Sequence, residues 1–232
     1  MIRFAELENL GLSVAAMTER RDGDCLIPQG GTARADCCDA LGISHESLTC
    51  GSQVHGTKVA VITEAERGSG GASPESALPA IDGLVTAVHG LPLAIFIADC
   101  VPLFLFAPTF RVGGLVHAGR KGTRADIAGI AVHTMKNSLG VPPEDIHALI
   151  GPSAGPGLYE VSEEIALDWQ SAGLPCQGRN LDLWAANRLA LVDAGVPDSQ
   201  IHISGLCTIA SGRFFSYRRG DAAARNMAVL ML

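Results

Sequence analysis

The strongest constraint on the fold of this chain is a series of short apolar segments between residues 82 and 117, separated by turn-forming residues. They read DGLVTAV, LPLAIFIAD, PLFLFAP and RVGGLVH. Continuous apolar runs of this length are typical of strands that are buried on both faces. Residues 91–108 together approach the length of a membrane span, but Asp99 lies at their centre and would cost about 2.5–3.5 kcal/mol in a bilayer. We therefore expect buried strands here and no membrane partner.

Helices interrupt these strands irregularly along the chain. Helices are predicted over 32–42, from Thr123 and Asp126 to Gly140, over 162–172 and over 182–194, and further strands over 11–17, 57–64, 146–152, 201–208, 213–219 and 227–232. This order favours an α+β fold with mixed sheets over a regular parallel wound sheet. No linker separates two self-sufficient cores, so residues 1–232 are predicted to form a single domain. Residues 66–80, rich in Gly, Ser, Pro and Ala, are expected to form an exposed loop, either a mobile flap or an insertion.

Charge and cysteine usage narrow the class of protein. The net charge of −7 argues against a duplex nucleic-acid partner, because such proteins need a basic face to neutralise phosphates. The N-terminal MIRFAELENL lacks the basic start and apolar stretch of a secretory signal. The seven cysteines are odd in number and contain no CxxC pair, which is typical of free thiols in a reducing compartment. We therefore expect a cytoplasmic protein.

Three segments carry side chains that can bind a metal: QVHG with His55, IADC with Cys100 and LVHAG with His117. Each ligand stands at or near the end of an apolar strand, followed closely by a small or turn-forming residue. Imidazole and thiolate are ligands for zinc, and for copper or iron in other settings. Three protein ligands leave a fourth position open, as a catalytic centre requires.

The residues alone leave other interpretations open. The ligands are 45 and 17 positions apart, so no local spacing indicates a shared metal. A buried cysteine is usually an inert small hydrophobe, and a histidine beside a strand is usually only hydrogen-bonded. Alternatively, Cys100 could act as a nucleophile with His117 as its base, in a hydrolase without metal. Asp99, next to Cys100, is a candidate proton-transfer group or an ordinary strand-end turn former.

Two basic segments suit an anionic substrate. HAGRKGT opens a predicted helix, where backbone N–H groups together with Arg120, Lys121 and Arg124 would attract a phosphate. Arg218 and its neighbours in the YRR segment offer a second cationic patch. The alternatives are a solvated basic turn and an exposed strand end.

The strings QVHG, DGLVT, ADCVPL, HAG, IGPSAGPGLYEV and FFSYRR, in this order, resemble the family once named laccase domain or multicopper polyphenol oxidase. That family is now understood as purine nucleoside phosphorylases with adenosine deaminase activity. The resemblance runs from about Gln53 to the C-terminus. It implies a layered α/β/β/α fold and a zinc ion bound by His55, Cys100 and His117.

The resemblance also implies the reaction. We expect phosphorolysis of purine nucleosides and deamination of adenosine, with adenosine and inosine as substrates and guanosine and methylthioadenosine as further candidates. Cys100, His117 and Asp99 are the expected catalytic residues, and Arg120, Lys121 and Arg218 the expected substrate and phosphate ligands.

The alternatives are a copper-dependent polyphenol oxidase, which seven histidines without an HxH pair do not favour, and an inactive metal-binding protein. The chain departs from the family's HAGWRG at Arg120 and Lys121, and from its paired cysteines at Gly157 and Leu158. These departures concern the expected substrate walls, and the three ligands are intact.

Overall fold

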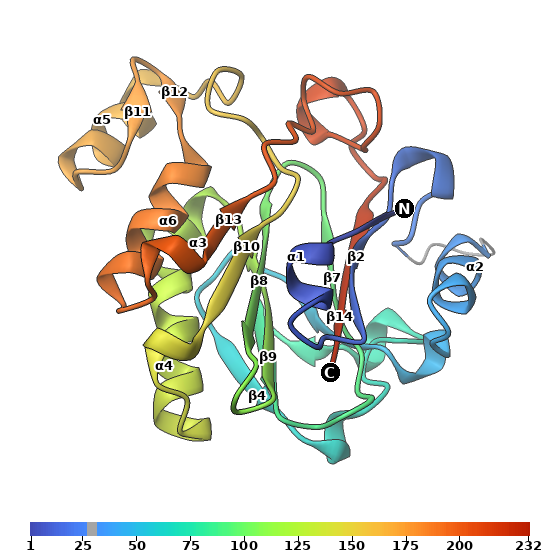
Figure 1. Ribbon diagram of the computed structural model, residues 1–232. Coiled ribbons are helices and arrows are strands. Elements are labelled where there is room, and N and C mark those ends of the chain that lie inside the picture. The colour runs from blue at the N-terminus through green and yellow to red at the C-terminus, as the bar shows by residue number, and fades with distance from the viewer. Residues whose placement is uncertain (27–31) are drawn as a thin grey trace.

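The computed structural model describes residues 1–26 and 32–232, and in it two six-stranded mixed sheets pack face to face between outer layers of helices (Figure 1). The first sheet runs in the order β1 (Ile2–Arg3), β2 (Val14–Met17), β14 (Asn226–Met231), β7 (Leu93–Ile97), β3 (Thr49–Ser52) and β5 (Leu78–Pro79). The second runs in the order β13 (Ile201–Ile203), β10 (His147–Ile150), β8 (Val101–Ala107), β9 (Val112–Ala118), β6 (Gly83–Thr86) and β4 (Val59–Ile62). The short strands β11 (Cys176–Gln177) and β12 (Asn180–Leu181) form a separate hairpin.

The helices lie on the outer faces of the two sheets, except the short first helix, whose Leu7 packs into the core between the sheets. They are α1 (Ala5–Glu8), α2 (Ala33–Ala40), α3 (Arg120–Arg124), α4 (Ile127–Leu139), α5 (Glu163–Ser171) and α6 (Leu183–Asp193). In Figure 1, α3, α4 and α6 cover the second sheet, whereas α2 lies on the side of the first sheet. The predicted α+β architecture, with α/β/β/α layers and mixed sheets, is confirmed.

Strand β8 shows why the apolar runs form this sandwich. Its residues alternate between two cores: Leu103 and Leu105 face the helices of the second sheet, and Phe104 and Phe106 face the first sheet. All four side chains are fully buried. Because successive side chains of a strand point to opposite faces, only a strand covered on both sides accommodates such a run. A third core, between the first sheet and α2, contains four of the cysteines.

The helix ends follow the local chemistry of the sequence. The Asp126 side chain accepts a hydrogen bond from the Gly129 amide and caps α4, and Gly140 ends that helix with φ 70°. Ser162 and Asp182 cap α5 and α6 in the same way. Thr123, however, lies in the separate short helix α3, because Asp126 adopts a left-handed conformation (φ 62°) that breaks the helix between the two.

Three expectations need correction. Residues 213–219 do not form a strand: Phe214 and Phe215 are buried in a loop, and Tyr217–Arg219 form a 3₁₀ turn. Only Ile201–Ile203 of the expected strand 201–208 pairs, with β10. Residues 66–80 lie partly at the surface as expected, but they are not separate from the body of the protein. β5 pairs with β3 in this segment, and Arg34 donates hydrogen bonds to the carbonyls of Gly70 and Gly71. The mobility of this segment stays a prediction.

Two further observations concern the expected environment of the protein. Within residues 1–26 and 32–232, every helix is too short or too polar to cross a bilayer. All seven cysteines carry free thiols, as predicted.

Candidate metal centre and cavity

Chain crossings between the two sheets bring the three predicted ligands together. His55 lies in the connection from β3 to β4, and Cys100 in the connection from β7 to β8, so each follows a strand of the first sheet and precedes one of the second. His117 lies within β9, whose register with β8 places it opposite Pro102. The ligands therefore meet at one end of the sandwich, although they are far apart in the sequence.

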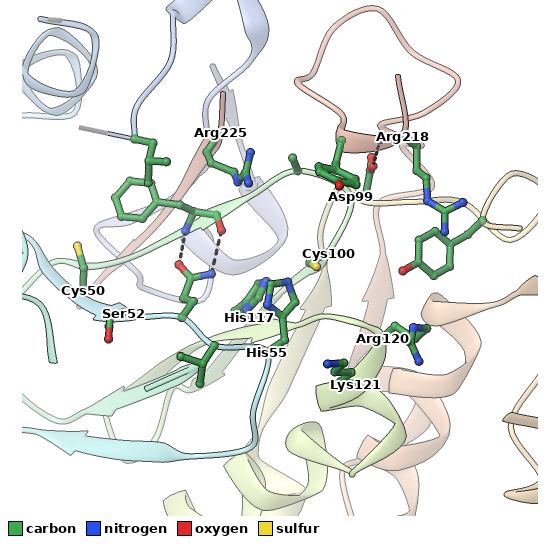
Figure 2. A pocket seen from close by; sticks show the side chains of 18 of the residues that line it. Cys50, Ser52, His55, Asp99, Cys100, His117, Arg120, Lys121, Arg218 and Arg225 are labelled. Carbon is green, nitrogen blue, oxygen red and sulfur yellow. Dashed lines mark hydrogen bonds between the residues drawn. The ribbon is translucent and has the colours of Figure 1, made fainter. Parts of the chain in front are cut away.

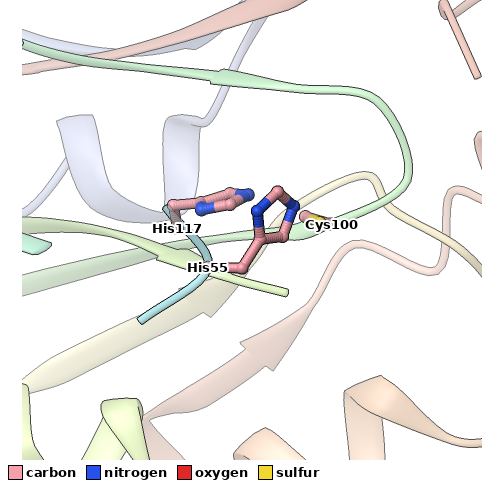
Figure 3. Close-up of side chains that lie close together, drawn as sticks. All are labelled: His55, Cys100 and His117. Carbon is pink, nitrogen blue, oxygen red and sulfur yellow. The ribbon is translucent and has the colours of Figure 1, made fainter. Parts of the chain in front are cut away.

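The ligand atoms of His55, Cys100 and His117 lie within 4.8 Å of one another (Figure 3). The two imidazole rings meet edge to face, with centroids 4.8 Å apart and an interplanar angle of 73°. Bonds of about 2.0–2.3 Å to a tetrahedral zinc would place such ligand atoms about 3.5 Å apart. His117 is buried, Cys100 is half-buried and His55 is exposed, so the group is open on the side of His55. This donor set fits a zinc ion with one free coordination position.

Asp82, immediately before β6, organises two of the three ligands. Its Oδ1 lies 2.8 Å from His117 Nδ1 and accepts a hydrogen bond of 2.9 Å from the His55 amide. Its Oδ2 accepts hydrogen bonds from the amides of Gly56 (2.8 Å) and Val54 (3.2 Å). Although burial favours its neutral form, the hydrogen bond from His117 and those from the amides lower the pKa of Asp82. An ionised carboxylate only accepts, so His117 Nδ1 is the donor and Nε2 is left for the metal.

The backbone around the centre is shaped to leave room for a ligand. His55 has φ 60°, a left-handed conformation that is uncommon for a side-chain-bearing residue, and the Asp82 bonds hold it there. Gly119 lies against the other side of the group. A Cβ atom at Gly119 would come within 2.8 Å of Cys100 Sγ and 2.9 Å of His55 Cδ2. A larger residue at this position would displace two of the three ligands.

Cys100 and His117 shift each other's pKa in opposite directions. Burial opposes ionisation of the Cys100 thiol, but the charge and hydrogen bond of His117 outweigh it and lower the pKa of Cys100 to about 6. Burial likewise opposes charging of His117, but the Cys100 thiolate and Asp82 together raise the pKa of His117 to about 9. At neutral pH the metal-free pair is therefore a thiolate and an imidazolium. Metal binding must displace the imidazolium proton.

The centre lines a cavity of about 890 Å³ that also receives the predicted basic residues (Figure 2). Arg120 and Lys121, at the start of α3, and Arg218, in the turn 217–219, all line this cavity. Among the described residues, none of these three cations forms an ion pair with a carboxylate. The Arg218 guanidinium instead lies over the Tyr159 ring, 4.5 Å from its centroid. The cationic end of the cavity, formed by Arg120, Lys121 and Arg218, suits an anionic group.

The other predicted residues have different surroundings. The two carboxylate oxygens of Asp99 accept hydrogen bonds from the Thr208 hydroxyl (2.6 Å) and the Arg218 amide (2.8 Å). Arg124 does not line the cavity, because it forms an ion pair with Asp168 on the surface. Its expected part in anion binding is therefore wrong. Since α3 spans a single short turn, the cationic side chains must carry the attraction for an anion.

Two features of the site could not be predicted from the sequence: the role of Asp82 beneath the metal ligands, and the pairing of Arg34 with Phe96 in the cavity wall. Asp82 stands in the DGLVT string, but as the polar start of an apolar run it was indistinguishable from a turn former. Phe96, directly before the IADC segment, and Arg34, far from every quoted string, also line the cavity. Their proximity depends on the packing of α2 against the first sheet, which no sequence spacing shows.

Comparisons with known proteins identify the family of this chain. A family model described as multi-copper polyphenol oxidoreductase laccase matches residues 30–232. Purine nucleoside phosphorylase YlmD of Geobacillus stearothermophilus is 39% identical over 195 residues, which cover 78% of this chain and 70% of the relative. Adenosine deaminase RL5, from an unknown prokaryotic organism, is 34% identical over 198 residues, covering 81% and 75%.

A solved structure extends the likeness to the whole fold. The crystal structure of YlmD from Geobacillus stearothermophilus superimposes with a TM-score of 0.85 at 33% identity, covering 94% of this chain and 91% of that one. The order of the strings, the layered fold and these matches agree. This chain belongs to the family described as multi-copper polyphenol oxidoreductase laccase, whose relatives include proteins named purine nucleoside phosphorylase.

Proposed function

We propose that this protein is a zinc-dependent purine nucleoside phosphorylase that also deaminates adenosine. The observation that carries the proposal is the convergence of His55, Cys100 and His117 on one point of a cavity that is also lined by the cationic end formed by Arg120, Lys121 and Arg218. The names of the relatives, purine nucleoside phosphorylase and adenosine deaminase, support the same pair of reactions.

The cationic end of the cavity is the proposed phosphate site. Arg120 and Arg218 each offer a planar fork of donors, and Lys121 adds a compact point charge. In phosphorolysis, a phosphate oxygen held there forms a bond to C1′ of the ribose while the bond from C1′ to the base breaks. The products are ribose 1-phosphate and the free base, which takes up a proton. The cations attract the phosphate, orient it and offset its charge during attack.

The metal centre lies beside the cationic end of the cavity, and Asp82 positions two of its three ligands. A zinc ion bound by the three ligands supplies Lewis acidity beside the substrate. Asp82 holds His117 with Nε2 facing the centre, and it fixes the turn that presents His55. In deamination, water replaces the amino group at C6 of adenosine and ammonia leaves.

Asp99 is proposed to position Arg218 rather than to transfer a proton. Both of its oxygens already accept hydrogen bonds, and one of these comes from the Arg218 amide itself. Asp99 is also held in a left-handed conformation, with φ 81°. Its carboxylate therefore orders the 217–219 turn on the cationic end of the cavity.

Copper oxidase chemistry is less well supported by the donor set. Multicopper oxidases need several ions and many histidine ligands. In the part of the chain that the structure describes, His55, Cys100 and His117 are the one group of three His, Cys, Asp or Glu side chains that could hold a metal. A metal-free cysteine hydrolase would also use the thiolate of Cys100 and the imidazolium of His117. That mechanism, however, gives no role to His55, which converges on the same point.

Product analysis tests the proposal. The zinc-loaded protein is incubated with inosine or adenosine, with and without phosphate, and the products are separated by chromatography. We expect hypoxanthine and ribose 1-phosphate from inosine only when phosphate is present, and inosine from adenosine without phosphate. Chelator-treated protein is the control. The proposal would be contradicted if the base were released equally with and without phosphate, or if neither nucleoside were consumed. Oxidation of phenols by the copper-loaded protein would favour the older family description.

A further inference from the structure

We propose that Phe96 is the platform on which the purine base stacks, at the end of the cavity away from the cationic end. This inference rests on the proposed function and assigns the orientation of the substrate. Phe96 lies in β7, is only partly buried and lines the cavity. It packs against the core that contains Cys50, and β3 runs beside β7 with Cys50 opposite Ala94. In Figure 2, Cys50 and Ser52 lie on one side of His55 and His117, and Arg120 and Lys121 on the other.

One face of the Phe96 ring is covered by a buried arginine that also lines the cavity. The Arg34 guanidinium lies over one face of the ring, 4.4 Å from its centroid, and Arg34 is only 5% exposed. Arg34 is itself held by hydrogen bonds to the carbonyls of Cys25 (2.8 Å), Gly70 (3.0 Å) and Gly71 (2.9 Å). A base can therefore stack only on the opposite face of the ring. A cation over one face draws on the electron density of the ring, which favours an electron-rich purine on the other.

The backbone of Phe96 is also fixed, by a side chain next to a metal ligand. The side-chain amide of Gln53 donates from Nε2 to the Phe96 carbonyl and accepts at Oε1 from the Phe96 backbone N–H, with both bonds 2.8 Å long. Gln53 stands two residues before His55 on the same connection. The ring and the metal centre are therefore held at a fixed separation by one short segment.

The chemistry of this end suits a base better than an anion. Cys50 and Ala77 line it, and a Cβ atom at Gly70 would come within 3.0 Å of the Cβ atoms of both, so the glycine keeps this wall of the cavity open. Two arginines also lie near this end, and both donate to backbone carbonyls: Arg34 as described, and Arg225 through Nη1 to Ala222 and Ala224. Arg218 likewise donates to the Glu160 carbonyl, so the phosphate is assigned to the cationic end because Arg120, Lys121 and Arg218 lie together there, with the metal centre between the two ends (Figure 2).

The test is to replace the ring and measure base and sugar binding separately on the zinc-loaded enzyme. Phe96→Leu keeps an apolar side chain of similar bulk, and Phe96→Tyr keeps the ring. Phe110→Leu is the matched control, since Phe110 is an exposed phenylalanine outside the cavity lining. Calorimetry gives the Kd of hypoxanthine and of ribose 1-phosphate, steady-state kinetics give KM for inosine and for phosphate, and metal analysis gives the zinc content.

We expect Phe96→Leu to raise the Kd of hypoxanthine and the KM for inosine about 5- to 150-fold, the range that loss of base–aromatic stacking covers. The Kd of ribose 1-phosphate, the KM for phosphate and the zinc content should stay as in the wild type. Phe96→Tyr should restore most of the hypoxanthine affinity, and Phe110→Leu should match the wild type.

Two results would overturn the assignment. One is an unchanged hypoxanthine Kd in Phe96→Leu, and the other is an equal weakening of hypoxanthine and ribose 1-phosphate. Failure of the proposed function would be seen in the wild-type enzyme instead, which would then consume no purine nucleoside or would release the base without phosphate.

Discussion

Replacing Asp82 by asparagine is the most revealing single change to the centre. Asp82 is 1% exposed, and its two oxygens receive four hydrogen-bond donors, two each. In Asp82→Asn, whichever way the amide turns, its NH₂ group faces two of these donors, and both lose their acceptor. A buried donor left without a partner costs about 1–3 kcal/mol, so we expect the free energy of unfolding of the apo protein to fall by about 2–6 kcal/mol.

The same substitution should weaken metal binding. Loss of the carboxylate that orients a histidine ligand typically lowers metal affinity about 10–100-fold. Urea denaturation of the apo protein and zinc titration against a competing chelator measure the two effects. Asp126→Asn is the matched control, because asparagine caps a helix about as well as aspartate and the change should cost less than about 0.5 kcal/mol. If Asp82→Asn matched this control in both assays, the role given to Asp82 would be refuted.

Other changes separate ligands from their surroundings. Cys100→Ser and His117→Ala should each be purified with little zinc and no activity, because serine is a far poorer ligand for a soft metal and alanine is no ligand. Full zinc occupancy in either variant, measured by elemental analysis, would refute the assignment of these residues as ligands. Lys121→Ala should keep its zinc and raise the KM for phosphate, so an unchanged phosphate response would remove Lys121 from the anion site. Between pH 6 and 9, zinc binding should release about one proton, from His117, and below pH 6 a second, from Cys100, so affinity rises with pH. Calorimetry in buffers of different ionisation enthalpy counts these protons, and binding without proton release would contradict the ion pair.

The parts of the fold that sequence predicts are those whose residues already show a complete local pattern. β8 is an apolar run that only a doubly covered strand explains, and α4 carries both its cap at Asp126 and its end at Gly140. β3, by contrast, reads TCGS and has no apolar periodicity. It becomes a strand because β7 and β5 lie on either side of it. Phe214 and Phe215 show the opposite case, since their burial comes from loop packing rather than from a sheet.

In the candidate site, too, some residues could be predicted from the sequence and others could not. The three ligands were predictable because their strings resemble a family, and the crossings between sheets then explain their convergence. Asp82 was not, because its role depends on the register of β6 with β9, in which Gly83 pairs with Val116 and the Asp82 carbonyl accepts from the His117 amide. The pair of Arg34 and Phe96 depends on the packing of α2 against the first sheet, which no spacing in the sequence shows.

X-ray absorption at the zinc edge of the purified, zinc-loaded protein tests the central claim most directly. With His55, Cys100 and His117 as ligands, the first shell should contain one sulfur at about 2.3 Å and two imidazole nitrogens at about 2.0–2.1 Å, with the remaining position taken by a light atom. The sulfur should disappear from the shell in any metal that Cys100→Ser retains. A wild-type zinc shell without sulfur, or one with two or more sulfurs, would contradict the assignment of this centre.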